Sequence, residues 1–307
     1  MSDFAPIALF VYRRLEHARE TIEALKLNQH AMLSDLHVFS DGPKDITSIS
    51  DVDRVREYVR SVQGFHTVKI VERNENLGLA NSIIRGVSEV LQRHERVIVV
   101  EDDLVTSPFF LRFMNEALDL YNRDLRVASI HGYVYPTMET LPETFFLRGA
   151  DCWGWATWRR GWQLFNPDGR ALLQALESQK LTNEFDFGGS FQYTQMLRDQ
   201  IEGKNNSWAI RWYASAFLAN ALTLYPGRSL VHNIGNDGSG THCLQSSAYG
   251  ASTSTEPVKV ESITVEDSAL ARHSFAAYAR AGIPPAKTPN VFSRMMHRLA
   301  RISSRNQ

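Results

Sequence analysis

The sequence has little cysteine, almost no net charge and no long apolar run. Its two cysteines in 307 residues, Cys152 and Cys243, lack metal-ligand spacing and cannot build a disulfide framework. We therefore expect free thiols in a reducing compartment, with a single disulfide as the alternative. A formal net charge of −1 gives no broad basic field, which argues against nucleic acid as a partner. No segment approaches the ~18 apolar residues of a membrane-spanning helix.

The two ends of the chain lead to a prediction about its location. Residues 1–6 carry no basic cluster and precede only a short apolar run, so we expect no signal peptide and a cytoplasmic protein. Residues 291–307 are basic, and their apolar side chains recur at helical spacing. This pattern is typical of a helix on the inner face of a membrane, which predicts a peripheral contact. The alternatives are a helix packed on its own domain and a partly ordered terminus.

Apolar strand patterns and helical patterns alternate between residues 6 and 100. This order predicts an α/β fold with a mixed, mostly parallel central sheet and helices on both faces. No G-x-G-x-x-G follows the first strand and no G-x-x-x-x-G-K-[ST] occurs, which argues against a dinucleotide-binding Rossmann or P-loop protein. The expected strands cover residues 6–12, 36–39, 67–71, 96–100, 127–130, 222–225 and 229–232; the expected helices cover residues 17–27, 51–62, 79–92, 109–121, 191–201, 208–222 and 268–281.

Three adjacent acids, Glu101, Asp102 and Asp103, directly follow the fourth expected strand. Residues 96–100 do not alternate between apolar and polar, which is typical of a strand buried on both faces. Three neighbouring carboxylates repel one another unless a cation lies between them, and such hard oxygen ligands suit Mg²⁺ or Mn²⁺. The alternative is a solvated acidic turn.

Polar residues also follow the neighbouring strands. Arg13 and Arg14 come after the first, Asp41 after the second, and residues 73–76 after the third. Because the carboxyl ends of parallel strands meet at one edge, where α/β sheets bind ligands, we expect these side chains to share a site with the three acids. Cations and carboxylates together suit a nucleoside diphosphate with its metal ion.

The second half of the chain is marked by aromatic and glycine-rich stretches. All six tryptophans lie between Trp153 and Trp212, and we expect most of them to pack in the core and one or two to contact a ligand. Glycines in residues 233–243 permit close approach of the backbone to a ligand. His242 in this stretch is a candidate metal ligand, with a structural hydrogen bond as the alternative.

Residues 99–104, followed by Ser107, Pro108 and paired phenylalanines, resemble GT-A glycosyltransferases and most closely the N-acetylglucosaminyltransferase I type. The resemblance covers about residues 6–243. It implies one GT-A domain over residues 1–290, with a nucleotide-sugar-binding half at 1–125 and an acceptor half at 126–290. The other family-like motifs are residues 11–14, 39–42, 154–155 and 238–242.

The resemblance assigns roles to individual residues. Asp103 is expected to bind the metal ion, Mn²⁺ or Mg²⁺, and His242 is the second metal candidate. The expected donor-binding residues are Arg14, Asp41, Asn76, Glu101, Asp102 and Trp155.

The sequence departs from the family at its general base, an aspartate within an Asp-Asp-Trp stretch. The matching position holds Asn206, whose amide cannot take up a proton. The remaining candidates are Asp151, Asp186 and Asp237. We expect Asp151 and Asp237 to be the catalytic candidates because each adjoins a family-like motif.

These observations predict a metal-dependent hexosyl- or N-acetylhexosaminyltransferase of polysaccharide biosynthesis. It would use a nucleoside-diphosphate sugar, expected to be UDP-linked, and transfer the sugar to a hydroxyl of a saccharide or lipid-linked glycan, with inversion if an acid is the base. Without a base, a retaining course is the alternative. One rival function is a nucleotidyltransferase that makes an activated sugar, although the first strand is not followed by glycine. The other is a non-catalytic sugar-binding protein, which Asn206 keeps open.

Overall fold

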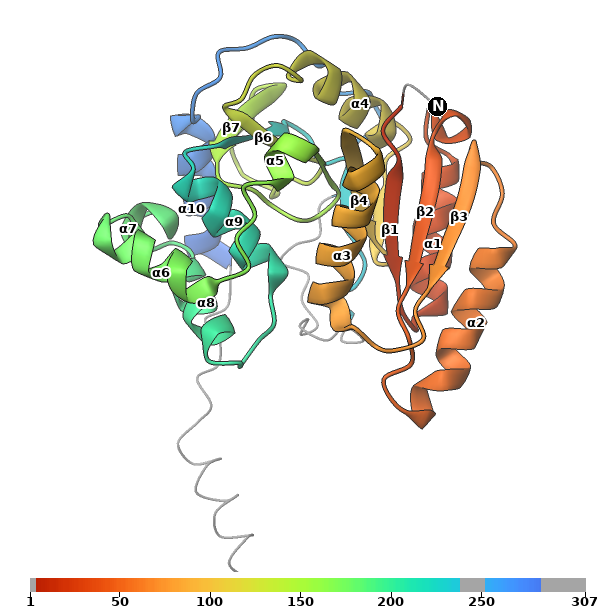
Figure 1. The fold of residues 1–307 in the computed structure, drawn as a ribbon. Helices are drawn as coiled ribbons and strands as arrows, with labels where there is room; N and C mark the ends of the chain where they lie inside the picture. The colour runs from red at the N-terminus through yellow and green to blue at the C-terminus, as the bar shows by residue number, and fades with distance from the viewer. Residues whose placement is uncertain (1–3, 238–251, 283–307) are drawn as a thin grey trace, which may run out of the picture.

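The computed structural model describes residues 4–237 and 252–282 (Figure 1). One eight-stranded sheet, in the order β3-β2-β1-β4-β8-β6-β9-β7, runs through the molecule. Strands β8 and β7 are antiparallel to their neighbours, and all other pairs are parallel. The predicted α/β fold with a mixed, mostly parallel sheet is confirmed. The strands of this sheet are β1 (Ile7–Val11), β2 (Asp35–Ser40), β3 (Thr67–Glu72), β4 (Arg96–Glu101), β6 (Val127–His131), β7 (Thr144–Arg148), β8 (Trp155–Trp158) and β9 (Leu222–Pro226).

Helices cover both faces of the sheet, as the sequence predicts. Alternate side chains of β1 point to opposite faces: Leu9 packs in the core that contains α1, α2 and α4, whereas Phe10 packs in the core that contains α3 and α9. Both faces are therefore apolar, which explains why the strand sequences do not alternate. The helices are α1 (Leu15–Lys26), α2 (Ile49–Arg60), α3 (Gly78–Arg93), α4 (Phe110–Leu120), α5 (Arg159–Trp162), α6 (Gly169–Ser178), α7 (Thr182–Phe185), α8 (Tyr193–Ile201), α9 (Trp208–Leu218) and α10 (Ala269–Gly282).

Strands β7 and β8 were not among the expected elements, and β8 determines how the two halves meet. It lies between β4 and β6 and is antiparallel to both. Because β8 runs opposite to β4, it begins beside the end of β4, with Trp155 paired to Val99. The residues just before β8 therefore lie near the acids that follow β4.

Most tryptophans pack in the core, as expected. Trp155 and Trp212 are 0 % exposed, and their ring centroids are 5.9 Å apart. Trp162 and Trp208 join them in the core between β8, α3 and α9, and Trp158 lies on the other face. This aromatic packing attaches the helices of the second half to the sheet.

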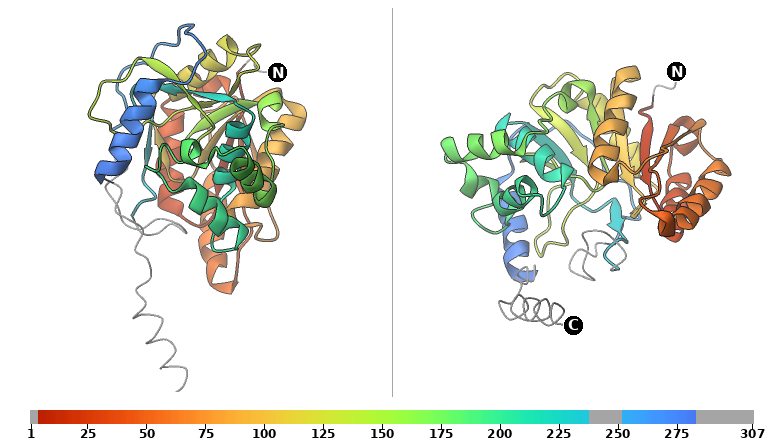
Figure 2. Two further views of the ribbon diagram at one scale, coloured as in Figure 1. Left: turned by 90° about the vertical axis from the view of Figure 1, so that its left-hand side faces the viewer. Right: turned by 60° about the horizontal axis from the view of Figure 1, so that its bottom comes forward.

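A second, two-stranded sheet forms at the carboxyl end of β4. Strand β5 (Leu104–Thr106) pairs antiparallel with β10 (Val231–Asn233). Figure 2 shows β10, in cyan, at the end of the molecule toward which β1 to β4 run. This pairing brings the segment after β10 back to the acids that precede β5.

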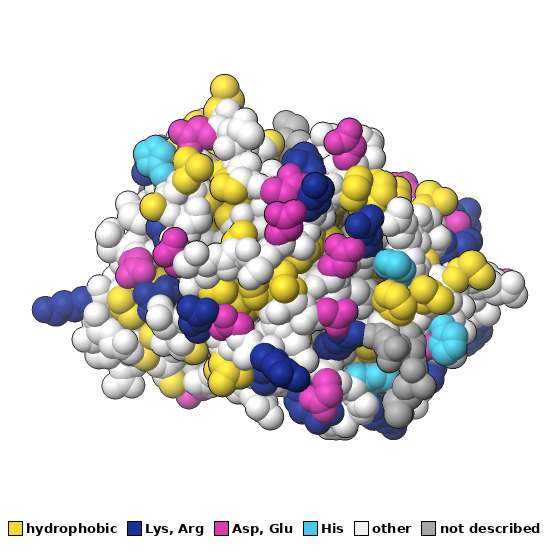
Figure 3. Space-filling model, turned by 90° about the horizontal axis from the view of Figure 1, so that it is seen from above, with side chains coloured by type: hydrophobic (Ala, Val, Ile, Leu, Met, Phe, Trp, Pro, Cys, Tyr) yellow, Lys and Arg dark blue, Asp and Glu magenta, His cyan; other side chains and the backbone are white. Residues whose placement is uncertain are grey.

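The described residues contain no helix long and apolar enough to cross a bilayer. The basic tail at 291–307 lies outside the described residues. Figure 3 shows the face at the amino ends of β1 to β4, where acidic and basic side chains are interspersed.

Candidate functional site

The three acids lie where β4 leaves the sheet. β4 ends at Glu101, and Asp102 and Asp103 form the turn into β5. One guanidinium nitrogen, Nη2 of Arg14, contacts Oδ1 of Asp102 and lies 2.8 Å from Oδ2 of Asp103. The hydroxyl of Thr21 in α1 donates to the carbonyl oxygen of Asp102 at 2.8 Å. The structure thus brings Arg14, which follows β1, to the acids that follow β4.

The carboxylates are withdrawn from water and lie beside one another. Burial raises the pKa of Glu101 to about 8, and the adjacent charges of Asp103 and Asp102 act in the same direction. Burial also raises the pKa of Asp102, although Arg14 opposes this. Burial alone would lower the pKa of Arg14, but the charges of Asp102 and Asp103 raise it above its ordinary value. Three acids beside one arginine therefore form a site that favours an additional cation.

The donor atoms suit a hard divalent ion that completes its coordination with other ligands. Among residues 4–237 and 252–282, no group of three or more His, Cys, Asp or Glu side chains is arranged to hold a metal ion. Mg²⁺ is usually bound by one or two carboxylates together with substrate phosphates and water, so such a group is not required. Asp103 and Asp102 would hold the ion, and His242 lies outside the described residues.

The segment after β10 packs directly against Asp103. The N–H of Ile234 donates to the carbonyl oxygen of Asp103 at 2.9 Å. A Cβ placed on Gly235 would lie 2.2 Å from Oδ2 of Asp103, so a larger residue would push this carboxylate away. Farther along, Oδ2 of Asp237 lies 3.2 Å from Nε2 of His17 in α1. The structure therefore places Asp237 in the neighbourhood of the acids, on a side chain that is 47 % exposed.

Asp41 and Asn76 hold the loop that leads into α3. The carboxylate of Asp41 accepts hydrogen bonds from the N–H groups of Leu77 and Gly78 at 2.8 and 2.9 Å. The amide of Asn76 donates to the carbonyl oxygen of Gly42 at 2.8 Å. Both residues lie at the strand ends where the sequence predicted them. The carboxylate of Asp41 and the amide of Asn76, however, already make hydrogen bonds to the backbone. Their contact with a donor therefore stays a prediction.

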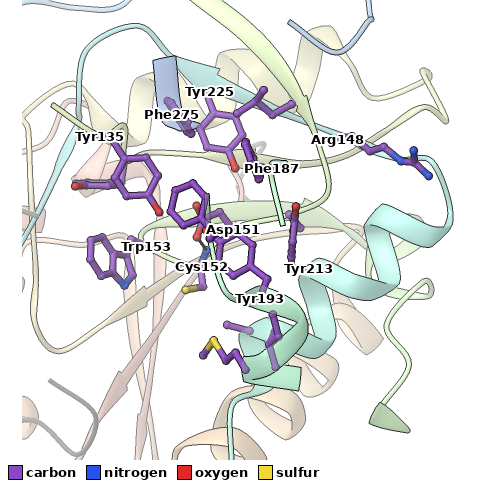
Figure 4. Close-up of a pocket in the computed structure, with 17 residues that line it drawn as sticks. Tyr135, Arg148, Asp151, Cys152, Trp153, Phe187, Tyr193, Tyr213, Tyr225 and Phe275 are labelled. Carbon is purple, nitrogen blue, oxygen red and sulfur yellow. Dashed lines mark hydrogen bonds between the residues drawn. The ribbon is translucent and has the colours of Figure 1, made fainter. Parts of the chain in front are cut away.

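A cavity of about 280 Å³ lies in the second half, next to the turn that precedes β8 (Figure 4). Asp151 and Trp153 form part of its wall. Nε2 of His131, at the end of β6, accepts a hydrogen bond from the N–H of Trp153 at 3.1 Å. Burial lowers the pKa of His131, so its ring is neutral and Nε2 can act as an acceptor. The aromatic residues that line the cavity are Tyr133, Tyr135, Trp153, Phe187, Phe191, Tyr193, Tyr213, Tyr225 and Phe275.

Cys152 lines this cavity, in the turn that precedes β8. Burial raises the pKa of its thiol, and the charges of Asp151, Glu101 and Asp103 add to the effect. The turn before β8 lies near the turn after β4, because Trp155 at the start of β8 pairs with Val99 near the end of β4. The antiparallel direction of β8 explains this proximity.

Two of the sequence-based candidates lie away from the acids and the cavity wall. Trp155 is fully buried, and its ring stacks on Trp208 with centroids 5.5 Å apart. The neighbouring Trp153 lines the cavity in its place. Asp186 accepts hydrogen bonds from the N–H and the hydroxyl of Thr194 at 2.7 and 2.9 Å, which holds the start of α8.

No protein-family model and no curated protein matches this chain. Solved structures show weak similarity. A mannosyltransferase from Pyrobaculum calidifontis, in complex with GDP-Man and Mn²⁺, is 17 % identical with a TM-score of 0.31, over 43 % of this chain and 35 % of that one. A putative nucleotide-diphospho-sugar transferase from Desulfovibrio desulfuricans is 14 % identical with a TM-score of 0.33, over 55 % and 69 %. For S. aureus TarS 1–349 the identity is 12 % and the TM-score 0.34, over 57 % and 49 %.

These TM-scores and identities are too low to decide the fold or the activity. The fold follows from the strand order and pairing described above.

Most residues that line the cavity were not predicted from the sequence. Its residues come from the loop after β6, from α8, α9, β9 and α10, and from the turn before β8. No spacing in the sequence connects such distant elements. The only local signal is the pair Tyr133 and Tyr135, which follows an apolar strand.

Proposed function

We propose that this chain is a metal-dependent glycosyltransferase that takes a sugar from a nucleoside-diphosphate sugar. One observation supports the proposal above all. Arg14 binds Asp102 and Asp103, Gly235 packs against Asp103, and the cavity lined by Asp151 lies nearby. An anion-binding side chain, oxygen ligands for a cation and a ligand-sized space are thus adjacent. The resemblance of residues 99–104 to GT-A glycosyltransferases of the N-acetylglucosaminyltransferase I type supports the same function.

The residues at the end of β4 and β1 would bind the diphosphate. A divalent ion held by Asp103 and Asp102 would neutralise the charge that develops on the leaving diphosphate. Nη1 of Arg14 is buried and has no hydrogen-bond partner among the described residues, so it can donate to a phosphate oxygen. In this proposal Glu101, Asp41 and Asn76 complete the donor side, and the donor is UDP-linked.

The proposed general base is Asp151. Its Oδ1 accepts the N–H of Cys152 at 2.8 Å, which fixes the carboxylate at the cavity wall, where an acceptor hydroxyl would reach it. Asp237 is the second candidate, and its interaction with His17 would orient it. A carboxylate base that deprotonates the acceptor leads to inversion at the anomeric carbon. The acceptor in this proposal is a saccharide or a lipid-linked glycan, with the tail at 291–307 holding the enzyme at a membrane.

The test is calorimetric titration of UDP, GDP, CMP and their sugar conjugates, with and without Mn²⁺. Wild type should bind one nucleotide sugar only with the metal. Asp103→Asn should weaken this binding by about 10- to 100-fold or more, because it removes a charged ligand. The control Asp51→Asn changes an acid in α2 whose described ion pair is with Arg54, and it should bind as wild type does.

Other outcomes would identify the rival functions. Consumption of a nucleoside triphosphate and a sugar phosphate, with release of pyrophosphate, would indicate a nucleotidyltransferase. Metal-dependent binding with neither transfer nor hydrolysis of the donor would indicate a non-catalytic sugar-binding protein. Binding that ignores both metal and Asp103 would contradict the proposal and leave the acids as a solvated turn.

A further inference from the structure

The cavity beside Asp151 has a polar centre formed by tyrosine hydroxyls and one carboxylate. In Figure 4 the hydroxyls of Tyr135 and Tyr225 point toward Asp151. Tyr225 is only 5 % exposed, and it lines the cavity. A hydroxyl at the wall of a largely apolar cavity is one of the few polar groups there that can fix the orientation of a ligand.

Several independent interactions fix this polar centre. The ring of Tyr225 stacks on Phe145, with centroids 5.5 Å apart and an interplanar angle of 5°. The ring of His131 packs against the same ring in a T-shaped arrangement, with ring centroids 4.9 Å apart. Burial raises the pKa of Tyr225 well above its ordinary value, and the charge of Asp151 adds to this, so the hydroxyl keeps its proton. It can therefore donate a hydrogen bond to a ligand.

Phenylalanine and aliphatic side chains form much of the rest of the cavity wall. Phe187 and Phe191 come from the loop between α7 and α8, and Phe275 comes from α10. Met196 of α8 and Ile210 of α9 extend the same surface. At about 280 Å³ the space lies near the lower end of the ~300–1,000 Å³ of ordinary ligand pockets. It therefore suits a single ring with a small substituent and excludes an extended chain.

The charge inside the cavity is negative. Asp151 is the acidic residue of the wall, and Arg148 is the basic one among the described residues that line it. The guanidinium of Arg148 donates to Glu184 and to the carbonyl oxygen of Phe217, both at 2.9 Å. Figure 4 shows it pointing away from Asp151. Anionic ligands such as uronic acids would be repelled.

We propose that this cavity binds one neutral sugar ring that carries an apolar substituent, either a deoxy or an N-acyl sugar. Asp151, Tyr225 and Tyr135 hold its hydroxyls, and the phenylalanines contact the substituent. The assignment deepens the proposed function and rests on it for its place in the reaction. The ring belongs either to the donor or to the end of the acceptor, because the turn that contains Cys152 leads into β8, which begins beside the end of β4.

The experiment is saturation-transfer NMR on the full chain with a matched set of methyl glycosides: hexose, 6-deoxyhexose, N-acetylhexosamine, free hexosamine and uronic acid. Each is measured alone and with UDP and Mn²⁺. The deoxy or N-acetyl glycoside should bind more tightly than the hexose, and the uronic acid should not bind. If the nucleotide sugar displaces the glycoside and UDP alone does not, the cavity holds the donor sugar. If the glycoside binds together with the nucleotide sugar, the cavity holds the acceptor ring.

Three variants test the residues. Tyr225→Phe removes one oxygen and keeps the ring, so it should weaken binding by roughly 3- to 10-fold. Asp151→Asn removes a charged acceptor and should weaken binding by roughly 10- to 100-fold. Ala209→Phe places a ring into the cavity from α9 and should abolish binding. The control Tyr58→Phe also removes one hydroxyl, which contacts Glu23 far from the cavity, and should have no effect.

The proposal is overturned if no glycoside binds under either condition, or if the free hexosamine or the uronic acid binds best. Equal binding by wild type, Tyr225→Phe and Asp151→Asn would also overturn it. When each glycoside is measured alone, its binding does not depend on Asp103, because no nucleotide or metal ion is present. Loss of nucleotide binding with retained glycoside binding would overturn the proposed function alone. Loss of glycoside binding with retained nucleotide binding would overturn only the assignment of the cavity.

Discussion

At the scale of single residues, His37 shows how burial alters a titratable group. It is 7 % exposed on β2, and its Nε2 has no hydrogen-bond partner among the described residues. Burial lowers its pKa to about 4, and the positive charges of Lys69 and His94 act in the same direction. Burial also lowers the pKa of His94. Its ring packs against that of His37 in a T-shaped arrangement, with ring centroids 5.7 Å apart. The pair therefore resists protonation in the folded protein.

We expect the protein to lose stability as the pH falls from about 6.5 to about 4. Over this range the unfolded chain takes up a proton at His37 that the folded chain does not, so protonation favours unfolding. Urea unfolding at several pH values should show a smaller loss for His37→Gln than for wild type. The exposed residue His273, changed to Gln, serves as the control and should follow wild type. An identical pH profile for His37→Gln would contradict the prediction.

The neighbours Trp155 and Trp153 should respond to mutation in opposite ways. Trp155 is fully buried against Trp208 and Trp212, so Trp155→Ala should cost about 3–5 kcal/mol of unfolding free energy. Trp153→Ala should cost less stability and weaken glycoside binding, because this side chain lines the cavity. Urea unfolding and NMR titration measure the two effects. Specific loss of donor binding in a stably folded Trp155→Phe variant would instead support the donor-binding role predicted from the sequence.

At the scale of elements, the pairing of β5 with β10 controls the position of Asp103. Gly235→Ala should displace the Asp103 carboxylate, because the added Cβ would lie 2.2 Å from Oδ2. We expect weaker binding of Mn²⁺ and nucleotide in calorimetry, with a far-UV circular dichroism spectrum like that of wild type. Asn236→Ala, in the same loop, is the control. Unchanged metal and nucleotide binding in Gly235→Ala would show that this loop does not position Asp103.

The sequence predicted the parallel half of the sheet because each strand there is a short apolar run followed by a polar turn. Strand β8 escaped prediction for a physical reason. It has only four residues, Trp155–Trp158, and so short a segment fits a strand, a helix or a loop equally well. The position of β8 between β4 and β6 depends on pairing between distant segments, which periodicity does not reveal.

One part of the candidate site could also be predicted from the sequence, and another part could not. Arg14 and the three acids could be predicted because each directly follows a strand, and parallel strands present their ends at one edge. The cavity could not be predicted, because its wall combines side chains from Tyr133 to Phe275 that only the folded chain brings together. Trp155 was chosen over Trp153 because the resemblance pointed to it. Trp155 is the first residue of β8 and is fully buried, whereas Trp153 lies in the turn before this strand and lines the cavity.

At the scale of the whole molecule, one sheet continues through both halves of the chain. Because β4 and β8 are paired, we expect the halves to unfold together in urea. All six tryptophans lie between Trp153 and Trp212, so their fluorescence reports the second half, whereas far-UV circular dichroism reports both. The two probes should give the same midpoint. Two separate midpoints would show that residues 1–125 form an independent domain.

The antiparallel insertion of β8 has a consequence for the evolution of the chain. The acids, Arg14 and their supporting helix come from residues before 107, whereas the cavity wall comes from residues after 132. Mutations that reshape the wall can therefore accumulate without altering the residues that would bind diphosphate and metal. The turn that contains Asp151, Cys152 and Trp153 lines the cavity and leads into β8 beside the end of β4, so selection should act most strictly there.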